Sequence, residues 1–291
     1  MKYRVGIIGY GFMGKTHAEV YCEHPDVKTV TVFDTNPAVF KRPPISRIIP
    51  YFKEKLGGDN RFDLVSICTP TYEHIANFLA FAERASSFLI EKPLALTLRE
   101  AQLIQRVASE RGITVYCAFV ERFNSPIMKL KREGCASHYE FVRIGSKPKS
   151  SWYCDNSKSG GPLFDLGIHD IDLALWLTAS DVDIIEATRT GDLYAVKLQL
   201  RNGVTVKIRT GWVDTPNHFE NSIVASRVTV HELNVHILSE GRYPAAYRDQ
   251  IHAFVDSKIN TQGNLASLED AISSIGVAER INAALSHANN L

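Results

Sequence analysis

Short apolar runs alternate with segments of helical periodicity over about the first 120 residues of the chain. Runs rich in β-branched and aromatic residues predict buried strands at residues 3–9, 29–34, 63–69, 88–91 and 113–118. Helical spacing between these runs predicts helices at residues 11–25, 72–85 and 97–111. Strands that are buried on both faces and separated by helices are typical of a parallel, doubly wound sheet.

The segment from residue 35 to residue 50 fits this alternation poorly. It reads TNPAVFKRPPISRIIP, and three of its last eight residues are proline. Because proline lacks an amide donor and breaks helices, we expect the second crossover to be short or irregular.

The pattern changes near Glu121. Residues 136–145 and 184–238 alternate between apolar and polar positions, which predicts a largely antiparallel sheet with one buried and one solvated face. Helical patterns appear at residues 162–177, 246–257 and 267–288. The chain is therefore expected to be an α/β protein with two domains, residues 1–120 and 121–291, whose last helix can pack back on the first domain.

Composition narrows the functional class. The 291 residues include 33 basic and 32 acidic side chains, a balance that gives no electrostatic footprint for nucleic acid or an anionic membrane. No apolar run reaches the roughly 18 residues of a membrane span, and the first residues predict a strand and not a signal peptide. The five cysteines are never spaced CxxC, so we expect reduced thiols and a cytoplasmic location.

The stretch GIIGYGFMG places Gly9, Gly11 and Gly14 in GxGxxG spacing between a predicted strand and a predicted helix. Gly9 would make the tight turn, Gly11 would let the backbone approach a pyrophosphate, and Gly14 would allow close packing of helix on strand. The helix N-terminus would offer free N–H groups to the anion. A glycine-rich turn without a ligand is the alternative interpretation.

Asp34 lies 20 residues beyond Gly14, at the end of the second predicted strand. Its carboxylate would accept hydrogen bonds from the adenosine ribose hydroxyls and repel a 2′-phosphate, which favours NAD over NADP. Lys41 and Arg42 keep NADP possible.

The stretch LIEKPLAL places Lys92 directly after an apolar strand, and Pro93 stiffens the backbone behind it. Loops at the carboxyl ends of such strands line the crevice in which doubly wound sheets bind ligands. We therefore expect Lys92 to face a ligand; a surface lysine after an edge strand is the alternative.

The predicted helix at 162–177 carries Asp165, His169 and Asp172 at positions i, i+4 and i+7, and therefore on one face. Asp165 could orient His169 as a general acid–base, the trio could bind a divalent metal, or the face could simply be solvated. Asp170 is expected to point to a different face.

The remaining histidines have no comparable set of partners in the sequence, and we expect most to be surface or structural residues. His74 is the exception, because it follows the end of the third strand in CTPTYEH.

Four motifs stand in order along the chain: GxGxxG, CTPTYEH, EKP and DLGIHDID. Together they resemble the glucose-fructose oxidoreductase, inositol dehydrogenase and rhizopine-catabolism (Gfo/Idh/MocA) family. The resemblance implies a Rossmann domain followed by an α/β domain with an open, largely antiparallel sheet. It also implies bound NAD or NADP and hydride transfer to or from a sugar, polyol or related carbonyl compound.

The resemblance also implies roles for single residues. Lys92 would contact the reacting hydroxyl, His169 would be the acid–base, Asp165 would lie close to the substrate, Asp172 would have a supporting role, and a cis bond is expected before Pro93. No metal is expected. The expected cofactor-binding residues are Gly9, Gly11, Phe12, Met13, Gly14, Asp34, Thr69, Pro70, His74, Glu91 and Lys92.

A narrower resemblance lies in VERFNSPIMKLK (120–131), which is similar to the ERFNP segment of members that oxidise nucleotide sugars, with Ser125 as a departure. Arg122, Trp152 and Tyr153 are the further substrate candidates. Relatives pair subunits through the polar face of the second sheet, which implies a homodimer or homotetramer. A dinucleotide-binding regulator without catalysis and a metal-dependent lyase remain the alternative functions.

Overall fold

The computed structural model describes residues 2–40, 48–52, 61–134, 136–149, 151–214, 223–230, 233–236, 244–258 and 263–288. The chain divides into two compact units. Unit 1 comprises Met1–Ala95, Arg99–Phe123 and Pro244–Leu268, and unit 2 comprises Leu96–Leu98, Asn124–Tyr243 and Glu269–Leu291. Within the described ranges, none of the helices has the length and apolar character needed to span a bilayer.

Unit 1 is built on a sheet of seven strands over the residues described, in the order β13-β6-β5-β4-β1-β2-β3. All neighbouring pairs from β6 to β3 are parallel, and only β13 runs antiparallel to its neighbour in the described part. This confirms the predicted doubly wound parallel sheet. The strands are β1 (Tyr3–Ile8), β2 (Val27–Asp34), β3 (Ile48–Phe52), β4 (Leu64–Ile67), β5 (Ser87–Ile90), β6 (Thr114–Cys117) and β13 (Ala266–Ser267).

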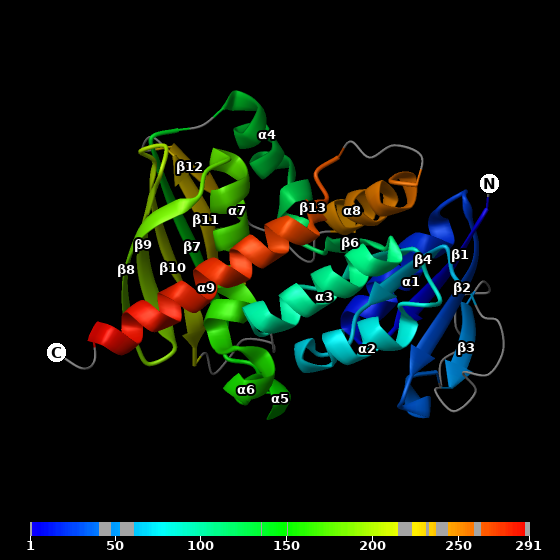
Figure 1. The fold of residues 1–291 in the computed structure, drawn as a ribbon. Coiled ribbons are helices and arrows are strands. Elements are labelled where there is room, and N and C mark those ends of the chain that lie inside the picture. Colours follow the sequence, from blue (N-terminus) through cyan, green and yellow to red (C-terminus); the bar gives the residue numbers. More distant parts are fainter. Residues whose placement is uncertain are drawn as a thin grey trace. The chain divides into compact units, whose positions relative to one another are not determined.

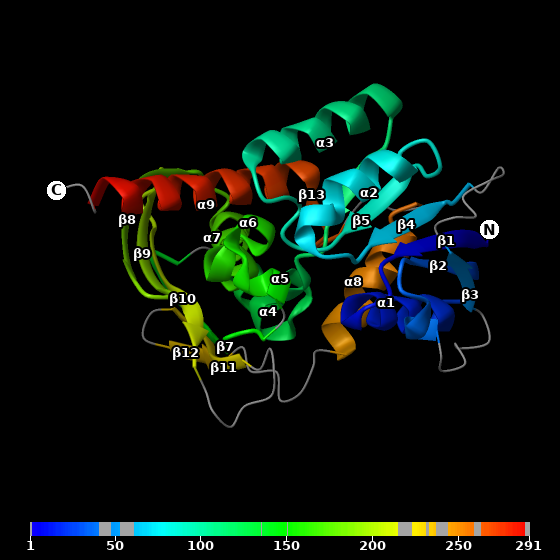
Figure 2. The same ribbon diagram turned by 90° about the horizontal axis from the view of Figure 1, so that it is seen from below.

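Helices cover both faces of this sheet (Figure 1). Figure 2 shows α1 and α8 on one side, with α2 and α3 on the other. The helices are α1 (Phe12–Glu23), α2 (His74–Phe81), α3 (Leu98–Arg111) and α8 (Pro244–Asp256), with short turns η1 (Pro37–Phe40), η3 (Thr71–Glu73) and η4 (Val120–Phe123). The chain thus returns to unit 1 through α8, whereas nearly all of the last helix, α9 (Leu268–Ala288), belongs to unit 2.

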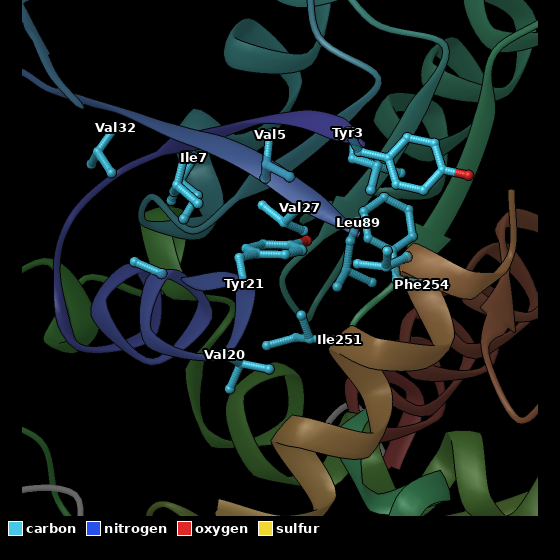
Figure 3. Close-up of a cluster of buried hydrophobic side chains, with 14 of the residues drawn as sticks. Tyr3, Val5, Ile7, Val20, Tyr21, Val27, Val32, Leu89, Ile251 and Phe254 are labelled. Atoms are coloured by element: carbon cyan, nitrogen blue, oxygen red, sulfur yellow. The ribbon is translucent and has the colours of Figure 1, made fainter. Parts of the chain in front are cut away.

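The core of unit 1 explains why α8 joins it. Ile251, Phe254 and Val255 have helical spacing, lie on one face of α8 and have no exposed surface. They belong to the same buried cluster as Val5 of β1 and Tyr21 of α1 (Figure 3). Because full burial of each large apolar side chain stabilises by about 1.5–3 kcal/mol, this face binds α8 firmly to unit 1.

Two strands of unit 1 are absent from the sequence-based expectation. Strand β3 falls at the end of the proline-rich segment, and Pro50 is tolerated there because β3 is an edge strand. Strand β13 has two residues, too few to show a periodicity, and it forms only because Ala266 and Ser267 pair with Cys117 and Tyr116. Residues 41–47, which include Lys41 and Arg42, lie outside the described residues.

Unit 2 contains a sheet of six strands over the described residues, in the order β12-β11-β7-β10-β9-β8. The β10–β7 pair is parallel and the other pairs are antiparallel, so the predicted, largely antiparallel sheet is confirmed. The strands are β7 (His138–Ser146), β8 (Val182–Thr190), β9 (Leu193–Leu200), β10 (Thr205–Val213), β11 (Ile223–Val230) and β12 (Leu233–His236).

The period-two alternation appears directly in burial. Along β9, Tyr194, Val196 and Leu198 are buried, whereas Ala195 and Lys197 between them are exposed. The helices of unit 2 besides α9 are α4 (Ser125–Glu133), α5 (Ser151–Cys154), α6 (Asn156–Ser159), the π-helical turn η5 (Leu163–Gly167) and α7 (Ile168–Thr178).

A buried ion pair ties α7 to the sheet of unit 2. Arg143 of β7 donates to Oδ1 of Asp170 from Nε at 3.0 Å and from Nη2 at 2.9 Å. The two side chains are 3% and 2% exposed. Asp170 therefore points toward the sheet.

Replacing Arg143 with Met should strongly destabilise the protein. The change leaves the Asp170 carboxylate buried without its cation, and breaking a buried pair in this way costs about 3–5 kcal/mol. The matched control is Lys129→Met, which breaks the exposed pair with Glu133 on α4 and should cost less than about 1 kcal/mol. Urea unfolding of both variants measures the difference, and equal destabilisation would contradict this account.

Candidate active site

The glycine loop connects β1 to α1 in unit 1. Gly9 has a φ of +89°, and a Cβ there would lie 2.9 Å from the backbone of Cys68 and Thr69. A Cβ on Gly14 would overlap the carbonyl oxygen of Gly9. At Gly11, by contrast, no atom of the described residues lies within 4 Å of the Cβ position. The loop is therefore tightly packed on its inner side and open at Gly11.

The open side of the loop fits the pyrophosphate of a dinucleotide. Gly11 is the N-cap of α1 and has no side chain with which to cap the helix. The N–H groups of the first turn favour an anion at this position. Phe12 is 53% exposed and Met13 is partly exposed at the same helix start.

Asp34 ends β2 next to this loop. Its Oδ2 accepts a hydrogen bond from the Tyr10 N–H at 2.7 Å, and its Oδ1 accepts one from the Asn36 N–H at 2.7 Å. These bonds fix the carboxylate against the loop. Each carboxylate oxygen retains a second lone pair, so Asp34 can still accept hydrogen bonds from ribose hydroxyls.

Strands β4 and β5 carry the other candidate residues of unit 1 to the same sheet edge, because the carboxyl ends of parallel neighbours meet there. Thr69 and Pro70 follow β4 and are partly exposed. Glu91 and Lys92 follow β5; Glu91 is buried and Lys92 is partly exposed. The Lys92–Pro93 peptide bond is cis, which confirms the expectation.

His74 is buried between the loop that follows β4 and the loop that follows β5. One ring nitrogen, Nε2, lies 2.9 Å from the Thr69 carbonyl oxygen, and Nδ1 lies 3.0 Å from that of Pro93. Burial lowers the pKa of His74, although the carbonyls and the nearby Glu91 charge act in the opposite direction. The neutral ring has one N–H, so it donates a hydrogen bond to only one of these carbonyls at a time. His74 is 1% exposed.

In unit 2, Asp165 lies in the π-helical turn η5, a kind of distortion that occurs often at functional sites. Gly167 lets this turn approach the sheet, because a Cβ there would lie 2.9 Å from Cγ2 of Thr210. Trp212 of β10 then donates from Nε1 to Oδ2 of Asp165 at 3.1 Å. Asp165 is partly exposed.

The helix face with Asp165, His169 and Asp172 is not a solvated surface. His169 is 7% exposed and Asp172 is 1% exposed. The interpretation as a solvated face is therefore wrong. Across the described ranges, no cluster of three or more His, Cys, Asp or Glu side chains is arranged to hold a metal ion.

Aromatic side chains lead from α5 to Trp212, the residue that bonds Asp165. Trp152 and Tyr153 of α5 have ring centroids 3.8 Å apart, and Tyr153 meets Trp212 edge-on at 6.4 Å. Trp152 and Tyr153 are both partly exposed. Arg122 of η4 is only 2% exposed, so its role as a substrate residue stays a prediction.

The structure brings the candidate residues together in two groups, one in each unit. The group in unit 1 contains the glycine loop, Asp34, Thr69, Pro70, His74, Glu91 and Lys92, and the group in unit 2 contains Asp165, His169, Asp172, Trp152 and Tyr153. The chemical roles of all these residues stay predictions.

The sequence-based expectation missed two residues that the structure places in these groups. Trp212 falls in a strand pattern that gives no hint of Asp165. His17 lies between Gly14 and Tyr21 at spacings of three and four, the buried face of α1, and this spacing could have identified it. Its nitrogens contact Ser66 and Glu91.

The fold and the glycine loop define a two-part protein with a dinucleotide-binding domain. Residues 3–119 match the oxidoreductase family with an NAD-binding Rossmann fold. Residues 134–231 match the GFO/IDH/MocA C-terminal domain. The chain belongs to the Gfo/Idh/MocA oxidoreductase family, as the ordered motifs predicted.

Curated relatives include two characterised activities. Inositol 2-dehydrogenase of Rhizobium meliloti (strain 1021) is 28% identical over 197 residues, which cover 65% of this chain and 58% of that protein. UDP-N-acetylglucosamine 3-dehydrogenase of Acidithiobacillus ferrooxidans is 28% identical over 216 residues, which cover 70% of this chain and 66% of that protein. The chain thus spans less than two thirds of the length of these relatives.

Among solved structures, scyllo-inositol dehydrogenase from Lactobacillus casei with bound NAD(H) and scyllo-inositol superposes with a TM-score of 0.75. It is 19% identical, and the superposition covers 99% of this chain and 98% of that one. At this identity the likeness establishes the fold.

The glycine loop yields a matched pair of variants. Gly11→Ala should leave the melting temperature nearly unchanged, since its Cβ meets no described atom, but should weaken NAD binding by occupying the space of the pyrophosphate. Gly14→Ala should lower the melting temperature, because its Cβ overlaps the Gly9 backbone. Thermal unfolding and NAD titration check both outcomes. Unchanged NAD affinity in Gly11→Ala would contradict the placement of the pyrophosphate.

Proposed function

We propose that the protein is an NAD-dependent dehydrogenase that transfers a hydride between nicotinamide and a secondary alcohol or carbonyl of a sugar, nucleotide sugar or polyol. The observation that carries the proposal lies within unit 1. The open glycine loop, Asp34 and Lys92 follow β1, β2 and β5 and lie at one edge of one parallel sheet. A cationic side chain at that edge is suited to contact a substrate presented to a bound dinucleotide.

The coenzyme, when bound, supplies a hydride acceptor. The protein must then hold the alcohol and manage its proton. Lys92 would donate a hydrogen bond to the reacting oxygen and stabilise the alkoxide that develops as the hydride leaves. His169 would accept the hydroxyl proton as general base and return it in the reverse reaction. Asp165, held by the Trp212 indole, would accept a hydrogen bond from a neighbouring substrate hydroxyl.

Support for a sugar-like substrate comes from the surroundings of Asp165. Trp152 and Tyr153 offer partly exposed, flat apolar surfaces, and Tyr153 meets the buried Trp212, whose indole bonds the Asp165 carboxylate. Aromatic faces and a carboxylate are a combination suited to a ring with C–H faces and hydroxyl edges. The two curated relatives named above act on an inositol and on a UDP-sugar. We propose the same substrate classes for this chain.

We also propose a homodimer or homotetramer and a cytoplasmic location. The outward face of the β8–β9 hairpin exposes Ile184 by 54% and Leu193 by 40%, which favours pairing through this sheet face. None of the described cysteines, Cys22, Cys68, Cys117 and Cys154, forms a disulfide, which is typical of a reducing compartment.

A substrate panel tests the proposed reaction. The protein is incubated with NAD⁺ or NADP⁺ and with UDP-sugars, aldoses and inositols, and reduced nicotinamide is followed by absorbance. We expect turnover with at least one compound, faster with NAD⁺ because the Asp34 carboxylate repels a 2′-phosphate. Retained NAD binding without any turnover would favour the regulator, loss of activity in EDTA would favour the metal-dependent lyase, and a preference for NADP⁺ would refute the role of Asp34.

Substitution of the two proton-handling residues tests the mechanism. Lys92→Ala and His169→Ala should each lower kcat by about 10²-fold or more, the usual size of a general acid–base contribution. NAD affinity should survive, because the glycine loop and Asp34 are untouched. Lys129→Ala on the exposed face of α4 is the control. Near-normal turnover in both variants would reject these roles.

A further inference from the structure

His17 is a buried histidine that links two functional segments of unit 1. It lies on α1, three residues after Gly14, and has no exposed surface. Its Nδ1 lies 3.1 Å from Oγ of Ser66 on β4. Its Nε2 lies 3.1 Å from Oε1 of Glu91, the residue before Lys92. The imidazole therefore connects the helix of the glycine loop with the loop that carries the lysine.

The hydrogen bonds around His17 have one self-consistent direction when Glu91 is ionised. A carboxylate only accepts hydrogen bonds, so the His17 Nε2–H donates to Glu91. In the neutral ring, Nδ1 then accepts from the Ser66 hydroxyl. The Ser66 oxygen in turn accepts from the Tyr21 hydroxyl at 2.7 Å. Each donor and acceptor named in this series of hydrogen bonds thereby has a partner.

Burial keeps Tyr21, at the far end of this series of hydrogen bonds, protonated. Tyr21 is fully buried between α1 and the sheet (Figure 3). Burial raises the pKa of its phenol well above the ordinary value. The Tyr21 hydroxyl therefore keeps its proton, so it can donate to Ser66 as this direction of the hydrogen bonds requires.

At its other end, the series of hydrogen bonds reaches the backbone of Lys92. The second carboxylate oxygen of Glu91, Oε2, accepts from the Lys92 N–H at 3.3 Å. On the other side of Lys92, the Pro93 carbonyl lies 3.0 Å from Nδ1 of His74. Two buried imidazoles on different helices thus lie against the residues immediately before and after the lysine.

We propose that His17 is a positioning residue for Lys92: by holding the Glu91 carboxylate, it fixes the backbone from which the lysine reaches the substrate. The inference rests on the proposed function of Lys92. Without His17, the Glu91 carboxylate can rotate toward the ammonium of Lys92 and displace it. Small displacements of a catalytic group lower the reaction rate steeply. Loss of His17 should therefore lower kcat and leave the affinity for NAD unchanged, because NAD binding depends on other groups.

Two near-isosteric variants separate the two contacts of His17. In His17→Gln, the amide nitrogen takes the place of Nε2 and can still donate to Glu91, while the contact with Ser66 is lost. In His17→Asn, the amide takes the place of Nδ1 and reaches Ser66, while the contact with Glu91 is lost. Each variant loses one buried hydrogen bond, and the bond to the Glu91 carboxylate is the stronger because it is charge-assisted. A merely structural role therefore predicts a lower melting temperature, most of all in His17→Asn, with the kcat of the folded protein unchanged in both variants.

We expect His17→Asn to lower kcat about tenfold or more, in keeping with the effect of a displaced catalytic group. His17→Gln should retain most of the wild-type kcat, and the NAD dissociation constant should be nearly unchanged in both. The measurements are steady-state kinetics, NAD titration and the melting temperature. Equal losses of kcat in the two variants, or wild-type kcat in His17→Asn, would overturn the proposal.

Glu91→Gln provides a second approach from the other end of the contact, should His17→Asn not fold. It retains an acceptor for His17 but turns an amide donor toward the Lys92 N–H, so kcat should fall; wild-type kcat would overturn the proposal. Where both single variants fold, the double variant should lose no more kcat than the worse single variant.

Lys92→Ala in the same assay separates this inference from the proposed function. Full turnover in Lys92→Ala would remove the proposed function itself. An inactive Lys92→Ala beside a fully active His17→Asn would remove only the role of His17.

Discussion

The parallel pairing of β4 with β1 and β5 is the constraint on which unit 1 depends. In a parallel ladder every strand delivers its following loop to the same edge of the sheet. The glycine loop, the Thr69 loop and the Lys92 loop therefore meet, although they are far apart along the chain. A shift in register would separate the Gly9 turn from the Cys68 backbone that it contacts. It would also move the start of α1 away from Lys92.

Buried polar groups then convert this proximity into fixed geometry. His74 spans the Thr69 and Pro93 carbonyls, and His17 spans Ser66 and Glu91. A buried polar group is costly unless its partners are in place, so these contacts favour one arrangement of the loops over many similar ones. Arg143 and Asp170 have the corresponding effect in unit 2, where they orient α7 on its sheet.

In unit 2 the decisive feature is close approach of helix to sheet. Gly167 gives the π-helical turn room against Thr210, and the Trp212 indole then reaches Asp165. The same turn leads directly into α7, which carries His169. Local distortion of the helix thus serves to present one carboxylate at the surface while its neighbours remain buried.

By itself the sequence determined the alternation of strands and helices, the two kinds of sheet, the glycine loop and the position of Lys92 directly after a strand, because periodicity and turn chemistry are local properties. Tertiary structure alone decided the pairing of β3 and β13, the return of α8 to unit 1 and the partners of His17. His17 and Glu91 are 74 residues apart, and no local pattern encodes a contact that depends on the register of strands between them. Asp170 is a further case, since helical spacing gave no partner for it and only the folded sheet supplied Arg143.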